Sequence, residues 1–175
     1  MANNPAMKKK DNKPAALDHV LYEMEMLVHA LLALCRADLS LSDKSGWLEV
    51  FAVHARNLNE FFAAKDFGPA YMKPYDFIAR SIHYEFDRGL AHRASAQVAH
   101  LTFDRERPEE KTPWAFEKYF KGLRVPALEF LRLVAPEEPL MAYHSNRQKT
   151  QRLLAILPTI RFESLETSAN IAKPV

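Results

Sequence analysis

Apolar residues recur along much of this chain at intervals of three and four positions, the spacing of amphipathic α-helices. The longest such stripe comprises Leu17, Val20, Leu21, Met24, Leu27, Val28, Leu31, Leu34 and Cys35. Only four of the 175 residues are glycine, and neither an Asn-Gly hairpin signal nor a sustained apolar/polar alternation occurs. Apolar residues make up 48% and charged residues 26%, the composition of a globular protein, and the length suits one domain. We therefore predict an all-α fold, a four-helix up-and-down bundle with short accessory helices.

The same periodicity sets the expected boundaries. The principal helices are expected at about 15–38, 44–64, 84–103 and 112–134, with shorter helical pieces at about 75–82 and 146–157. Residues 1–14 are polar and basic, and we expect a flexible N-terminal arm there. Residues 15–157 should form a single helical-bundle domain. Residues 158–175 have no sustained apolar stripe, and we expect a C-terminal tail that is separable from the bundle.

Charge and cysteine content restrict the environment of the protein. The formal net charge of +2 is close to balance, so no strong global attraction to nucleic acid is expected, although a local basic groove is compatible with it. The single cysteine, Cys35, cannot form an internal disulfide and falls on an apolar helical position, where we expect it to serve core packing. No apolar run approaches the ~20 residues that cross a bilayer. These features predict a cytoplasmic location and no membrane partner.

The most informative stretch is residues 88–105, within the third expected helix. Positions seven apart on an α-helix point within about 20° of each other, so Arg93 and His100 share a face. Gln97 lies between them, and Asp104 extends the row. An imidazole can move a proton to or from a ribose 2′-hydroxyl, and a guanidinium can hold a phosphate while negative charge develops. The set suits metal-independent RNA cleavage, with His100 and Arg93 as catalytic residues and Gln97 and Asp104 supporting them.

Plainer interpretations of the histidines stay open. His100 could simply bond to Asp104 on the solvated face of a surface helix. A metal site built on His83, His92 and His100 is disfavoured, because spacings of nine and eight residues do not share a helix face. We expect no metal and no cofactor; glycine-rich nucleotide-binding motifs are also missing. His54, on the apolar face of the second expected helix, is interpreted as a hydrogen-bonded core histidine.

Arg93 and His100, separated by six residues on a helix of a predicted four-helix bundle, resemble the Arg-x(4–6)-His signature of the HEPN superfamily. The runs Val-Ala-His-Leu-Thr at 98–102 and His-Ala-Arg-Asn at 54–57 are also similar to those of small uncharacterised bacterial proteins. The resemblance covers roughly residues 15–135. It implies a metal-independent endoribonuclease, of a kind found in toxin–antitoxin and phage-defence systems.

The resemblance also implies a homodimer in which the Arg93 and His100 side chains of two protomers face one cleft, with RNA as substrate and an antitoxin or another regulatory protein as partner. This chain departs from the pattern at Ala94, because the position after the arginine is often polar in active members. The superfamily also includes inactive bundles. The alternative function is therefore a non-catalytic helical-bundle protein-interaction module.

Overall fold

The computed structural model describes residues 12–63, 71–95 and 115–162, and every regular element within them is helical. Four α-helices are long: α2 (Lys13–Leu34), α3 (Leu41–Ala63), α5 (Phe116–Val134) and α6 (His144–Ile156). The shorter elements are α4 (Arg88–Arg93) and the 3₁₀ turns η1 (Pro74–Asp76), η5 (Leu140–Ala142) and η6 (Leu157–Thr159). The predicted all-α bundle is confirmed.

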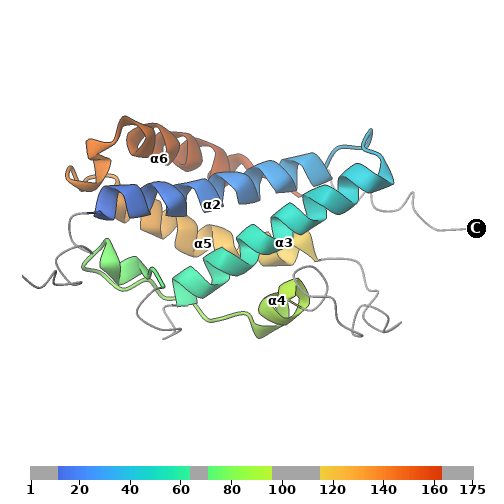
Figure 1. Ribbon diagram of the computed structural model, residues 1–175, viewed down its shortest axis with the longest axis horizontal. Coiled ribbons are helices and arrows are strands. Elements are labelled where there is room, and N and C mark those ends of the chain that lie inside the picture. The colour runs from blue at the N-terminus through green and yellow to red at the C-terminus, as the bar shows by residue number, and fades with distance from the viewer. Residues whose placement is uncertain (1–11, 64–70, 96–114, 163–175) are drawn as a thin grey trace, which may run out of the picture.

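The four long helices form a closed ring of contacts. α2 packs on α3 and α6, and α5 completes the ring by packing on the same two helices. As Figure 1 shows, α2 and α6 run in one direction and α3 and α5 in the other. The successive pairs α2–α3 and α5–α6 are therefore antiparallel, as in an up-and-down bundle. α3 and α5 are parallel because the chain between them returns along the bundle through α4.

The fourth long helix of the described bundle is α6, which was expected to be a short accessory piece at 146–157. The expected third principal helix at 84–103 begins only at Arg88, and residues 96–114 lie outside the described residues. α6 joins the bundle because it buries Thr150 and Leu153 while packing on α2 and α5, and polar bonds to α2 accompany this packing. Lys149 bonds to Asp18 at 2.9 Å, and Arg152 bonds to Glu25 at 2.7 Å.

The core confirms the stripe that the sequence predicted for the first helix. The α2 residues of this stripe from Leu17 to Leu31 are at most 4% exposed. The buried aromatic rings of α3 and α5 belong to the same core, and Phe61 and Phe130 meet edge-on with ring centroids 5.3 Å apart. Cys35 is half-buried against this core, where burial raises the pKa of its thiol, and its Sγ donates to the Leu31 carbonyl at 2.9 Å. The packing role expected for Cys35 is confirmed.

Both predicted domain boundaries differ from the structure. α2 begins at Lys13, and the buried Asn146 amide donates to the Pro14 carbonyl at 2.8 Å. Lys13 and Pro14 therefore belong to the bundle and not to an arm. At the other end, Ile160 is 8% and Phe162 6% exposed, and Phe162 meets Phe120 edge-on at 5.7 Å. The packed unit therefore extends to Phe162, four residues beyond the expected start of the tail.

One further property of the helices concerns membranes. Within the described ranges, no helix combines the length and the apolar character that crossing a membrane requires.

Candidate functional site

Of the predicted site residues, Arg93 is the one that the structure describes. It is the last residue of α4 and is half-buried. Gln97, His100 and Asp104 lie outside the described residues, so the predicted row of four side chains stays a prediction. The described part of the site consists of the helix that carries Arg93 and the residues that hold this helix in place.

α4 starts where Asp87 caps it. The Asp87 carboxylate accepts a hydrogen bond from the Leu90 backbone N–H at 3.0 Å, satisfying one of the N–H groups that a helix leaves unpaired at its first turn. This cap explains why the helix begins at Arg88 and not at Tyr84 as expected. The side chains of Leu90 and Ala94, four positions apart, form the buried side of this helix and are 1% and 2% exposed. An apolar side chain thus fits position 94, which gives a packing reason for an alanine where the HEPN signature often has a polar residue.

A buried side chain of α3 fixes the position of this cap. Asn59 is fully buried, and its amide nitrogen donates to the Asp87 carbonyl at 2.9 Å. Its amide oxygen accepts from the Asp87 backbone N–H at 2.9 Å and from the Tyr84 hydroxyl at 2.8 Å. Burial, with a smaller effect of the Asp87 charge, raises the pKa of Tyr84, so its hydroxyl stays protonated as a donor. Asn59 therefore ties the start of the Arg93 helix to the bundle.

We predict that Asn59→Ala lowers the free energy of unfolding by about 3 kcal/mol, because three groups lose their buried hydrogen-bond partner. Chemical denaturation would measure the loss, and hydrogen exchange should show the Leu90 and Ala91 amides exchanging faster. Asn57→Ala is the matched control, since Asn57 is exposed on the same helix and makes one side-chain bond. Equal losses in the two variants would contradict the anchoring role of Asn59.

A second polar cluster joins α3 to α2. His54 Nδ1 lies 2.7 Å from Glu23 Oε2, and the Asn57 amide donates to the same oxygen at 3.0 Å. The His54 side chain is only 13% exposed, and Tyr22 meets its ring edge-on at 5.8 Å. The predicted hydrogen bonding of His54 is confirmed, but the residue is only partly buried and lies beside the core, not within it. Arg56 of the same motif turns away and pairs with Glu60 at 2.9 Å.

The Glu23 carboxylate supplies the charge of this cluster. Burial opposes its ionisation, but the hydrogen bonds from His54 and Asn57 outweigh burial and lower the pKa of Glu23 below 4.5. Chemically, a carboxylate on Nδ1 fixes the orientation of an imidazole ring. Because the His54 ring is largely buried between two helices, the bonds of this cluster hold α2 and α3 in register.

We predict that Glu23→Gln costs about 1 kcal/mol of stability near neutral pH, where a charge-assisted pair of hydrogen bonds is lost. A group with a lowered pKa in the folded state stabilises fully above its unfolded pKa, and the effect is lost as pH falls through the folded value. The difference between wild type and variant should therefore shrink as pH falls below about 4.5. Denaturation at a series of pH values measures it.

Glu25→Gln is the matched control for this prediction. Glu25 lies on the same helix and pairs with Arg152, whose side chain is 63% exposed, and an ion pair with such an exposed partner contributes little. A Glu25→Gln variant as unstable as Glu23→Gln, or a Glu23→Gln defect that persists unchanged at acid pH, would contradict the role assigned to Glu23.

Sequence reasoning missed Asn59, Asp87 and Glu23. A signal for Asn59 was present, because it continues a helical row with Ala52, Ala55 and Phe62, each at most 1% exposed. A polar residue within an apolar row is a candidate for buried hydrogen bonding. Glu23 carried no comparable signal, since its partners are 31 and 34 positions away. Among the described residues, no group of three or more His, Cys, Asp or Glu side chains could hold a metal ion.

Comparison with known proteins adds no family assignment. The chain matches no protein-family model, no curated protein and no solved structure at a significant level.

Proposed function

We propose that the protein is a metal-independent endoribonuclease of the HEPN type, with His100 and Arg93 as its catalytic residues. The observation that carries the proposal is the anchoring of the Arg93 helix. The start of α4 is capped by Asp87 and bonded through both Asp87 backbone groups to the buried Asn59 of α3. A catalytic arginine needs such support, because a phosphate contact works only when the guanidinium is held in the productive geometry.

The proposed reaction uses the ribose 2′-hydroxyl as nucleophile. The 2′-hydroxyl loses its proton as its oxygen bonds to the phosphorus, the bond from phosphorus to the 5′-oxygen breaks, and the leaving 5′-oxygen gains a proton. In this proposal His100 moves a proton during the reaction, and Arg93 neutralises the charge on the phosphate oxygens. Gln97 and Asp104 support the two. The products carry a 2′,3′-cyclic phosphate and a 5′-hydroxyl.

Labelled RNA incubated with the pure protein in EDTA tests this proposal. Cleavage should proceed, its fragments should carry 2′,3′-cyclic phosphate ends, and DNA of the same sequence should stay intact because it has no 2′-hydroxyl. Fragments with 3′-hydroxyl ends, or equal cleavage of DNA, would contradict the mechanism. Because the family setting implies narrow substrates, total RNA from several sources serves better than one synthetic strand.

We further predict a homodimer. One arginine and one histidine per chain supply little charge for an RNA strand, and pairing across a two-fold axis doubles the set. Light scattering at micromolar concentration should give about twice the 20.1 kDa mass of one chain. A mass equal to one chain would count against the shared cleft. The proposed setting is the cytoplasm, in toxin–antitoxin or phage defence, with an antitoxin or other regulatory protein as partner.

A further inference from the structure

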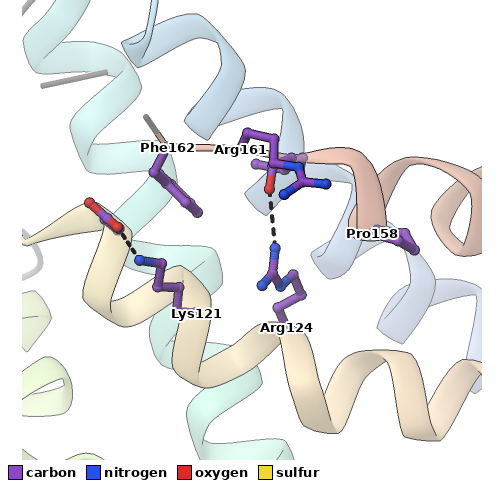
Figure 2. Close-up of a pocket in the computed structure, with 7 residues that line it drawn as sticks. Lys121, Arg124, Pro158, Arg161 and Phe162 are labelled. Atoms are coloured by element: carbon purple, nitrogen blue, oxygen red, sulfur yellow. Dashed lines mark hydrogen bonds and ion pairs between the residues drawn. The ribbon is translucent and has the colours of Figure 1, made fainter. Parts of the chain in front are cut away.

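A pocket of about 380 Å³ lies between the first turns of α5 and the segment that follows α6 (Figure 2). Its volume falls in the range of small-ligand sites. Three cationic side chains line it, Lys121 and Arg124 from α5 and Arg161 from the opposite wall, against one carboxylate, Glu117. The whole chain has a formal net charge of only +2, so this wall is a local concentration of positive charge.

Arg124 is held in place but keeps donors to spare. One of its guanidinium nitrogens donates to the Ile160 carbonyl at 3.1 Å, a bond drawn in Figure 2, and the side chain is half-buried. A guanidinium has five N–H donors, and this bond uses one. Its other donors find no acceptor among the residues that the structure describes.

The other two cations differ in how far they are paired. Lys121 is bonded to Glu117 and lies 5.4 Å from the centroid of the Phe162 ring, so its charge is largely neutralised. Arg161 is exposed, and within the described ranges its side chain has neither an ion pair nor a hydrogen bond. The pocket therefore presents two arginines whose charge the described part of the protein does not neutralise.

We propose that this pocket binds a phosphate group. Arginine suits phosphate because its planar fork donates two parallel hydrogen bonds to two oxygens. A carboxylate has two oxygens in one plane and is satisfied by one such fork. A phosphate presents its oxygens in several directions and can accept from guanidinium groups on two walls. The pairing of Arg124 with Arg161 across a pocket thus selects phosphate over carboxylate.

Binding of inorganic phosphate, followed by isothermal titration calorimetry on the full chain, tests this proposal without any RNA cleavage. Wild type should bind phosphate saturably and acetate much more weakly. Arg161→Gln should weaken phosphate binding by about tenfold or more, since a hydrogen bond to a charged group is lost. Arg161 is exposed and makes no bond in the described structure, so this variant should fold normally.

Two further variants make the test specific. Arg124→Lys keeps the charge but loses the planar fork, and it should also weaken phosphate binding. Arg132→Gln is the matched control, because Arg132 is exposed near the other end of α5 and does not line the pocket. Its phosphate affinity should equal that of wild type. No saturable phosphate binding by wild type, equal binding of acetate, or an equal loss in Arg132→Gln would overturn the proposal.

A competition arm identifies the source of the phosphate. A short 2′-O-methyl RNA strand, which lacks the 2′-hydroxyl nucleophile, is titrated in the presence of phosphate. If the strand displaces phosphate from wild type but not from Arg161→Gln, the ligand is a nucleic-acid backbone. Saturable phosphate binding that the strand does not displace identifies a small phosphorylated ligand. Both results support the phosphate site, and failure of this site leaves the proposed cleavage chemistry at His100 and Arg93 untouched.

Discussion

A chain that ends at Pro158 should unfold at a temperature about 10 °C lower than a chain that ends at Phe162, because about 3–6 kcal/mol of apolar burial is removed. The loss comes from Ile160 and Phe162, both less than 10% exposed. Truncation also removes the carbonyl of Ile160, to which Arg124 donates. Thermal denaturation followed by circular dichroism measures the difference.

Comparing these two endpoints isolates the packed residues, because both chains lack everything after Phe162. Phe162→Ala in the full chain gives a second measurement, and it should reproduce a large part of the loss, since the ring packs on Phe120. Arg161→Ala serves as the control, because the residue between the two buried ones is exposed. Equal melting temperatures of the two truncated chains would show that Ile160 and Phe162 contribute nothing to the core.

The largest expected effect on activity is that of His100→Ala, which should reduce RNA cleavage by about 10²–10⁴-fold, the usual contribution of a general acid or base. Cleavage is measured in EDTA under single-turnover conditions, with the fold monitored by circular dichroism. Cleavage that persists at the wild-type rate in His100→Ala would assign the activity to another residue or to a contaminating nuclease.

Arg93 provides an independent arm of the same test. Arg93→Ala should also be severely impaired, whereas Arg93→Lys should recover only part of the rate, because lysine keeps the charge but not the planar two-point contact with phosphate. The neighbouring His92, exposed on α4, supplies the matched control. His92→Ala should cleave like wild type. Equal loss in His92→Ala and Arg93→Ala would indicate that the defect is in α4 as a whole and not in phosphate contact.

The predicted site and the described structure overlap at one residue. Sequence spacing places Arg93 and His100 on one helical face, an inference that needs only the geometry of a single helix. The contacts that hold this helix in the fold cannot be inferred from the geometry of a single helix. Asn59 and Asp87 are 28 positions apart, and no property of either residue alone predicts that they meet. The position of Asn59 on an apolar row predicts its burial but not its partner.

What the sequence by itself determined is the helical class and the buried face of its helices. The stripe from Leu17 to Leu31 is buried as expected, because helical periodicity is a local property that each segment carries independently. Only the tertiary structure decided the extent of the bundle. α6 has few apolar residues, yet it is a full member of the bundle. Leu153 is 2% exposed in the shared core, and Asn146, Lys149 and Arg152 bond to α2 from 127 to 132 positions away. Ile160 and Phe162 are too few to form a periodic pattern, and they are buried because α5 offers an apolar surface beside them. Burial of this kind depends on which surfaces the folded chain brings together, and the local pattern of residues does not predict that.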